Sequence, residues 1–205
     1  MNEKGNQKGN RKEQAQLRRR QIIDAALRVF AEKGYDRASV KDISEAAGTS
    51  QGLMYHYFRS KEELLAAVLE SHSFIGQLSH IIASTHGKPI RRVLYDITAG
   101  LYGLLCSNRE LTSIVIREMQ TNTNFKKNWA AIAMKGVTLL SDYLQSNVDA
   151  GWLKPHNTEV AARSIFYTVV MLFLSSDIFT WSKPSAGDYI QQMVDIFLDG
   201  LAVRS

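Results

Sequence analysis

The sequence predicts an all-α fold: an N-terminal three-helix domain that contains a helix-turn-helix, joined by a long helix to a C-terminal helical domain. Three observations lead to this prediction. Apolar residues recur at the i, i+3, i+4 spacing of helices along most of the chain. Helix-capping residues and glycines divide the chain into segments of helix length. No stretch alternates apolar and polar residues as strands do, and no repeat or nucleotide-type glycine loop is present.

The composition is that of a globular protein of the cell interior. The chain has 205 residues, of which 45% are apolar and 22% charged, which is enough for a sizeable core. A single cysteine, Cys106, excludes an internal disulfide framework and favours a reducing compartment. The first residues lack the apolar segment of a signal peptide, and the longest apolar run, near residues 169–174, is far shorter than the ~20 residues of a membrane span. We therefore expect a cytoplasmic protein with no membrane partner.

The N-terminal domain is predicted over residues 15–60, after a disordered basic tail over residues 1–14. Residues 1–20 contain seven Lys or Arg and two Glu, so they carry the whole net charge of +5. From about Ala15 a helix continues to Gly34, and it supports the next two helices from behind. Its apolar residues at helical spacing are Ile22, Ile23, Ala26, Leu27 and Phe30.

Residues 39–58 have the pattern of a short helix, a tight turn and a second short helix. Ser39 and Asp42 form a capping box that begins the first helix. Gly48 can adopt the left-handed conformation that ends a helix, and Ser50 can cap the next one. The pattern therefore predicts a helix-turn-helix.

The second helix of this motif, Gln51–Tyr57, carries hydrogen-bonding side chains and no acidic residue. Such a surface suits a polyanionic groove, where phosphates attract donors and repel carboxylates. We interpret Gln51–Tyr57 as the recognition helix of a DNA-binding domain. The predicted DNA-binding residues are Ser39, Val40, Thr49, Ser50, Gln51, Gly52, Leu53, Tyr55, His56, Tyr57 and Lys61.

These residues are expected to divide into two kinds of contact. Base edges lie nearest to the start of the recognition helix, at Gln51, Gly52 and Leu53, where Gly52 allows close backbone approach. The tyrosines and His56 are expected mainly at phosphates. Lys61 begins the next helix beside unpaired backbone amides, a suitable place to hold a phosphate; the alternative is a solvated lysine.

The segment Tyr55-His56-Tyr57-Phe58, followed by Ser60-Lys61-Glu62-Glu63-Leu64, resembles the signature of the tetracycline-repressor (TetR) family of transcriptional regulators. Ile23-Asp24-Ala25-Ala26, Phe30, Gly34-Tyr35 and Ile43-Ser44-Glu45-Ala46-Ala47-Gly48 fit the same pattern. The resemblance covers about residues 19–69, and beyond them it extends only to length and helical character. Gln51 stands where a Lys or Arg would be unsurprising and Met54 where an aliphatic residue is usual, so the operator sequence stays open.

The resemblance implies a regulator, most often a repressor, that binds double-stranded operator DNA as a homodimer and responds to a small molecule. It also implies that the position of Lys61 contacts the DNA backbone. For the basic tail, two interpretations stay open. It contacts phosphates or a neighbouring groove, or it is a disordered leader that increases solubility.

Residues 61–205 are predicted to form the helical ligand-binding and dimerisation domain. Ser60 and Glu63 form a capping box for a long helix toward Ile81 or Ile82. The later helices are expected to begin at Pro89, Asn108, Asn124, Asn157 and residues 184–188, the last two running to about Thr180 and Val203.

No catalytic or metal site is indicated. The five histidines are scattered, and no cysteine or carboxylate completes a metal set around them. Cys106 has no motif around it, and no serine sits in a nucleophile elbow. We therefore expect neither an enzyme nor a cofactor.

A ligand pocket is predicted between helices that contain Tyr102, Glu118, Trp129 and Phe166. Glu118 falls on an apolar stripe, so it needs a partner, either an arginine in a structural ion pair or a cationic or hydroxylated ligand. The aromatic content favours a small lipophilic or aromatic effector. The alternative is that these residues are simply core.

The last two helices are predicted to form the homodimer interface. The helix over residues 159–180 is apolar nearly all round, and one intramolecular neighbour cannot cover it. Paired with its copy, it forms a four-helix interface. The expected interface residues are Phe166, Val170, Phe173, Ile190, Val194, Phe197, Leu198 and Leu201.

Two functions remain. The first is a ligand-responsive regulator, in which a homodimer binds a palindromic operator as a repressor and is released by the effector. The second is a DNA-binding architectural or partner-controlled protein of the same fold without a physiological ligand. A cavity in the C-terminal domain would favour the first.

Overall fold

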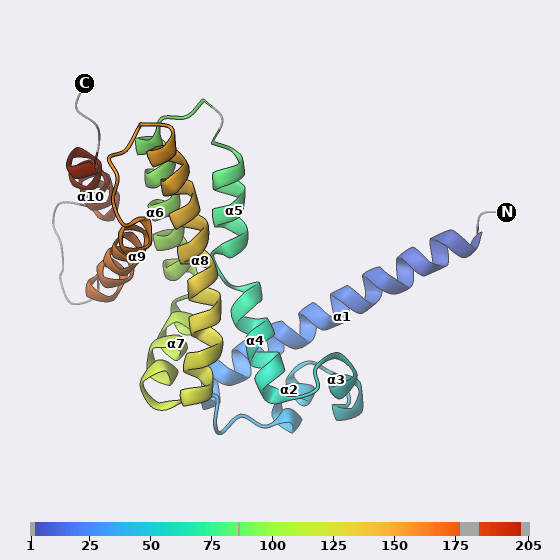
Figure 1. Cartoon of the computed structure of the whole chain (residues 1–205). Helices are drawn as coiled ribbons and strands as arrows, with labels where there is room; N and C mark the ends of the chain where they lie inside the picture. The colour runs from blue at the N-terminus through green and yellow to red at the C-terminus, as the bar shows by residue number, and fades with distance from the viewer. Residues whose placement is uncertain (1–2, 86, 177–184, 202–205) are drawn as a thin grey trace. The chain divides into compact units, whose positions relative to one another are not determined.

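The computed structural model describes residues 3–85, 87–176 and 185–201. Within these ranges the chain is helical and has no strand, which confirms the all-α prediction (Figure 1). The helices are α1 (Glu3–Lys33), α2 (Val40–Ala46), α3 (Gln51–Tyr57), α4 (Lys61–Ser71), α5 (Ile75–Ala83), α6 (Ile90–Ser107), α7 (Arg109–Thr121), α8 (Thr123–Asp149), α9 (Thr158–Ser175) and α10 (Ala186–Leu201).

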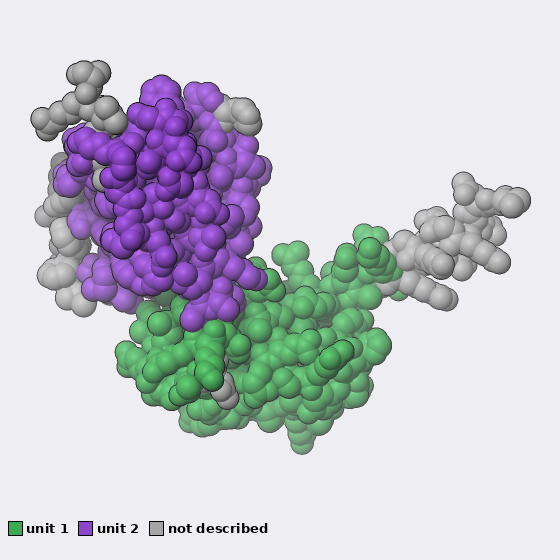
Figure 2. Space-filling model, in the orientation of Figure 1, with its two compact units in different colours: residues 1–72, 110–129 green, residues 73–109, 130–205 purple. Residues whose placement is uncertain are grey.

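The chain divides into two compact units, coloured separately in Figure 2. Unit 1 comprises residues 1–72 and 110–129, and unit 2 comprises residues 73–109 and 130–205. The compact units divide the chain after residue 72, whereas the sequence predicted a boundary between residues 60 and 61. Unit 1 contains α4, which packs against α1, together with nearly all of α7 and the start of α8.

Helix α1 begins before the predicted start at Ala15. It runs from Glu3, so the structure has helix where a disordered tail was predicted over residues 1–14. The side chains of residues 12–21 are exposed all round the helix. Lys, Gln, Glu, Ala, Leu and Arg make up this stretch, and all are good helix formers, so local propensity favours the helix without burial.

The core of unit 1 is built from α1 to α4 around a few fully buried side chains. Helix α1 packs against α2 and α4. Ile22 and Phe30 of α1 are buried, as are Ile43 of α2, Met54 of α3 and Leu64 of α4. This packing fixes the back of the helix-turn-helix, as the sequence predicted.

The long linking helix predicted toward Ile81 is interrupted. Helix α4 ends at Ser71 and α5 begins at Ile75, with His72 as the C-cap of α4. The Ser71 hydroxyl donates to the carbonyl of Val68 at 3.0 Å. Serine competes with the helix for backbone hydrogen bonds, and the boundary between the units falls at this break.

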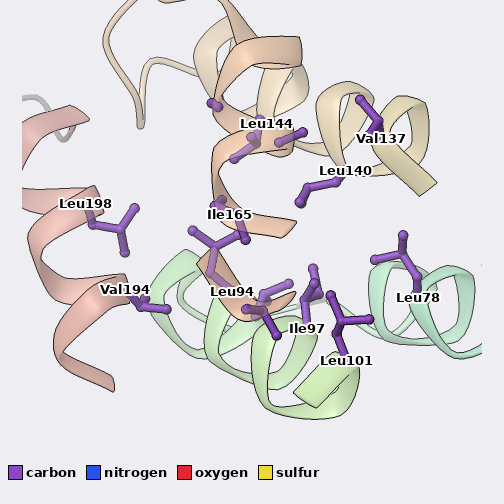
Figure 3. Close-up of a cluster of buried hydrophobic side chains, with 14 of the residues drawn as sticks. Leu78, Leu94, Ile97, Leu101, Val137, Leu140, Leu144, Ile165, Val194 and Leu198 are labelled. Atoms are coloured by element: carbon purple, nitrogen blue, oxygen red, sulfur yellow. The ribbon is translucent and has the colours of Figure 1, made fainter. Parts of the chain in front are cut away.

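Unit 2 is a helical bundle whose core comes from α5, α6, α8, α9 and α10 (Figure 3). Helix α6 packs against α9 and α10. Leu94 and Ile97 of α6 meet Ile165 of α9 and Val194 of α10 in this cluster. By length and composition α9 could cross a membrane, a property it shares with core helices of globular proteins, and Ala162, Ile165 and Val169 of it are buried here.

The start of α8 also differs from expectation. Asn122, rather than Asn124, caps this helix: its side-chain oxygen accepts a hydrogen bond from the Phe125 backbone amide at 3.0 Å. The predicted continuations of α9 to Thr180 and of α10 to Val203 lie outside the described residues.

Candidate nucleic-acid interface

The helix-turn-helix has the local geometry that its sequence predicts. Ser39 Oγ accepts from the Asp42 amide at 3.1 Å, and the Ser39 amide donates to Asp42 Oδ2 at 2.9 Å, which closes the capping box. Gly48 has a φ of +60° at the turn. Ser50 Oγ then accepts from the Leu53 amide at 3.1 Å and begins α3.

Helix α3 is anchored by buried side chains on one side, and its other side, the front, is exposed. Met54 and Phe58 are completely buried, whereas Gln51, Tyr55 and His56 are exposed. The open front therefore carries amide, phenol and imidazole groups and no carboxylate. Such a face is complementary to phosphates and base edges.

Gly52 leaves a free approach to the α3 backbone. A Cβ placed on it would meet nothing within 4 Å, so neighbouring packing does not require glycine there. Glycine within a helix costs about 0.5–1 kcal/mol of folding free energy relative to alanine. Because packing does not explain why position 52 holds a glycine that weakens the helix, the glycine is consistent with a partner that approaches this backbone closely.

The predicted DNA-binding side chains near α2 are less available for contacts with DNA than the sequence suggested. The hydroxyls of Ser39 and Ser50 already make the caps. Val40 is half-buried, and the Thr49 hydroxyl is buried with no hydrogen-bond partner among the described residues. A side-chain contact from Thr49 to DNA is therefore not supported, because its oxygen does not reach the surface.

The Lys61 side chain makes hydrogen bonds within unit 1 that neither sequence interpretation, phosphate ligand or solvated lysine, included. Its Nζ donates to the carbonyl oxygens of Tyr35, Asp36 and Ala38 at 2.8, 3.3 and 3.1 Å. The ammonium also lies 4.4 Å from the centroid of the Tyr35 ring. An ammonium has three N–H donors, and all three are engaged, so Lys61 fastens the loop between α1 and α2 to α4.

A groove lies between α1 and α3, and it was not predicted from the sequence. It has a volume of about 390 Å³. Helix α1 contributes Gln14, Ala15, Leu17, Arg18 and Gln21, and α3 contributes Leu53 and Tyr57. The signal for it was the helical recurrence of residues 14, 18 and 21, but residue 14 had been assigned to the tail.

The four residues of the predicted ligand pocket belong to different units. Glu118 and Trp129 lie in unit 1, and Tyr102 and Phe166 lie in unit 2. Glu118 is 5% exposed; its Oε1 is 3.7 Å from Arg117 Nε, while its Oε2 is buried without a hydrogen-bond partner among the described residues. The expected arginine partner is thus present, and the ligand site stays a prediction. Among the described residues no group of His, Cys, Asp or Glu is arranged to hold a metal ion.

Four of the eight predicted dimer residues are buried within the single chain, and the interface itself stays a prediction. Phe173, Ile190, Val194 and Leu198 are at most 5% exposed within the single chain, so they offer little surface to a second copy. Phe166, Val170 and Phe197 are half-buried, and the Leu201 side chain lies outside the described part. The apolar side chains that are exposed on these helices are Val160, Tyr167, Met171 and Ile196.

Comparison with known proteins agrees with this architecture. The sequence model of the family described as bacterial regulatory proteins, tetR family, matches residues 22–68. The HTH-type transcriptional repressor Rv1474c of Mycobacterium tuberculosis is 30% identical over 135 residues, which cover 65% of this chain and 67% of that protein. The fatty acid metabolism regulator protein of Bacillus subtilis is 27% identical over 153 residues, 73% of this chain and 78% of that protein.

A solved structure shares the fold. The transcriptional regulator FadR from Bacillus subtilis in complex with stearoyl-CoA has a TM-score of 0.72 and 23% identity, over 88% of this chain and 97% of that one. The motif of α2 and α3, the helical body and the relatives agree with one another. The chain belongs to the tetR family of bacterial regulatory proteins, and it is a DNA-binding transcriptional regulator rather than an enzyme.

Proposed function

We propose that the protein is a cytoplasmic repressor that binds a palindromic operator as a homodimer and is released by a lipophilic effector. The observation that carries the proposal is the front of α3. Buried Met54 and Phe58 anchor the helix, and its exposed face offers donors, no carboxylate and the open backbone at Gly52. A rigid helix with that surface enters the major groove.

The contacts divide along α3. Gln51, Gly52 and Leu53, at its start, read base edges: the Gln51 amide suits adenine, and Leu53 suits a thymine methyl group. Tyr55, His56 and Tyr57 hold phosphates on either side of the groove. Lys61 is removed from this set, because its donors are engaged within the chain.

The dimer forms through the exposed sides of α9 and α10. Val160, Tyr167 and Met171 recur at i, i+7 and i+11, so they form one apolar stripe along α9. Ile196, 76% exposed, places a further apolar side chain on α10. A two-fold dimer presents two α3 helices to successive major grooves, which lie ~34–36 Å apart.

The effector is proposed to be a lipophilic molecule with a polar end. A relative is named as a fatty acid metabolism regulator, and the FadR structure is a complex with stearoyl-CoA. A long acyl chain agrees with the lipophilic effector expected from the aromatic residues of the body. Long-chain acyl-CoA is therefore the first compound to test.

Selection of duplexes from a random-sequence pool tests the DNA-binding part. The wild-type protein should enrich an inverted repeat, and light scattering should report a dimer. Enrichment of a single half-site, or of no sequence, would contradict the proposal.

Titration of stearoyl-CoA onto the selected complex tests the release step. Coupling free energies of 1–3 kcal/mol correspond to a loss of operator affinity of about 5–150-fold. Free coenzyme A is the control for the polar part. A dimer whose operator affinity no acyl-CoA changes would favour the architectural or partner-controlled alternative.

A further inference from the structure

The groove between α1 and α3 adjoins the surface that faces DNA. Leu53, which is exposed, and Tyr57, which is half-buried, belong to its lining and also to the recognition helix. Opposite them, α1 presents Gln14, Arg18 and Gln21. The groove is thus continuous with the DNA-reading surface.

One face of α1 forms this wall. Residues 14, 18 and 21 recur at i, i+4 and i+7 and share that face. Gln16 and Arg20 lie two residues further on, about 200° around the helix, and neither lines the groove. All five side chains are exposed, so none of them is required for the core.

The chemistry of the lining identifies the occupant. It offers a guanidinium, two amides and a phenol hydroxyl, and it contains no carboxylate. Leu17 and Leu53, which are 59% and 39% exposed, add apolar surface between these donors. Donors spaced along an apolar wall match a sugar–phosphate strand, whose phosphates accept hydrogen bonds and whose sugars present apolar edges.

We propose that this groove holds the DNA backbone next to the base pairs that α3 reads, with Arg18 as the phosphate ligand and Gln14 and Gln21 beside it. The inference rests on the DNA-binding role of α3 and extends it. Helix α1 is then a second DNA-binding element, a helical arm rather than only a support. The phosphate contact assigned by sequence to Lys61 is made from α1 instead.

Two matched pairs of substitutions on α1 test the proposal. Arg18→Gln removes a charge from the groove, and Arg20→Gln removes the same charge from the opposite face. Gln14→Glu adds a carboxylate to the groove, and Gln16→Glu adds it opposite. All four side chains are exposed, and the exchanges keep good helix formers, so the melting temperature should not change.

The measurement is operator affinity as a function of salt, on the duplex selected by the wild-type protein. Each phosphate contact contributes about 0.9 to the slope of log K against log salt, so Arg18→Gln should reduce the slope of a dimer by about 2. Arg20→Gln should leave it nearly unchanged. Gln14→Glu should weaken binding more than Gln16→Glu, and hydroxyl-radical protection of the flanking backbone should be lost in Arg18→Gln.

Equal slopes and equal footprints within both pairs would overturn the proposal while leaving DNA binding by α3 intact. A change of oligomeric state in the groove variants, with the slope unchanged, would also overturn it, because the groove would then hold protein. A wild-type protein that selects no DNA would instead refute the proposed function itself.

Discussion

Helices α3 and α9 each bury one side and leave the other free, but the two free sides differ in chemistry. Helix α3 buries Met54 and exposes Gln51, Tyr55 and His56. Helix α9 buries Ile165, Val169 and Phe173 and exposes Val160, Tyr167 and Met171. A free side that carries donors without acids suits a polyanion, whereas an apolar free side suits a second apolar surface. The chemistry of the free side, rather than of the helix as a whole, indicates the partner.

The largest expected effect is on folding stability, and it should distinguish the buried side of α9 from its exposed side. Phe173 is buried, and the Arg109 guanidinium carbon lies 5.2 Å from the centroid of the Phe173 ring. Phe173→Ala should lower the free energy of unfolding by about 3–5 kcal/mol, because it leaves a cavity in the core. Urea unfolding at fixed protein concentration measures this effect.

Met171→Glu on the opposite side of α9 is the matched variant. Its side chain is 60% exposed, so the chain should still fold, and light scattering should report a monomer with weak operator binding. A dimeric Met171→Glu protein would place the interface elsewhere. A fully stable Phe173→Ala protein would show that the two sides of α9 are assigned the wrong way round.

The next effect concerns Lys61, which was predicted to contact a DNA phosphate and which donates hydrogen bonds to backbone carbonyl oxygens within the chain. Lys61→Met keeps the apolar stem and removes three hydrogen bonds to carbonyl oxygens. Hydrogen bonds to charged groups contribute about 1.5–3 kcal/mol, so unfolding should become easier by about 2 kcal/mol. The salt slope of operator binding should stay as in the wild type. A lower slope with unchanged stability would return Lys61 to the DNA contacts.

A smaller effect should raise folding stability while lowering operator affinity. Gly52→Ala adds a methyl group where nothing lies within 4 Å. It should raise the free energy of unfolding by about 0.5–1 kcal/mol, because alanine favours the helix. Operator affinity should fall, since the methyl group occupies the approach to the α3 backbone. Calorimetry measures the stability, and fluorescence anisotropy measures the operator affinity. Equal or tighter operator binding by Gly52→Ala would exclude a close approach of DNA at this residue.

The smallest effect compares the capping boxes of α2 and α10. In the second, the Ser185 amide donates to Asp188 Oδ2 at 3.1 Å and the Asp188 amide donates to Ser185 Oγ at 3.2 Å. The Lys33 ammonium, 2.7 Å away, and hydrogen bonds from Ser39 hold the pKa of Asp42 well below its ordinary value of 3.8. Hydrogen bonds from the hydroxyl and the backbone amide of Ser185 likewise lower the pKa of Asp188. Each carboxylate therefore stabilises the fold above about pH 4, and that stabilisation is lost as pH falls through its lowered pKa. NMR titration should find Asp42 below Asp188; the reverse order would show that Lys33 contributes nothing.

Sequence reasoning succeeded where the buried and free residues of an element differ chemically. In α3 the anchors are Met54 and Phe58 and the free residues are polar, so the pattern alone separates them. The caps at Ser39 and Ser50 are local, because donor and acceptor lie three residues apart. The helix-turn-helix could therefore be predicted almost completely.

The failures have identifiable physical causes. Both sides of α9 are apolar, and no sequence pattern distinguishes a core side from an interface side of the same composition. The carbonyl acceptors of Lys61 lie 23 to 26 residues upstream, so only the folded chain brings them to the ammonium. In α1 the Gly-, Asn-, Gln- and Lys-rich residues 1–14 were predicted to be disordered, although residues 12–14 are good helix formers that extend the helix predicted from Ala15.

The most direct test of the central claim places a carboxylate on the free side of α3. Gln51→Glu is isosteric, lies at an exposed position and adds a negative charge at a helix N-terminus, where it favours folding. Melting temperature and dimer mass should therefore be preserved. Operator affinity at physiological salt should fall by at least about tenfold, because a base contact worth about 1–3 kcal/mol becomes a repulsion. Unchanged affinity of a folded Gln51→Glu dimer would contradict the claim that this face of α3 reads DNA.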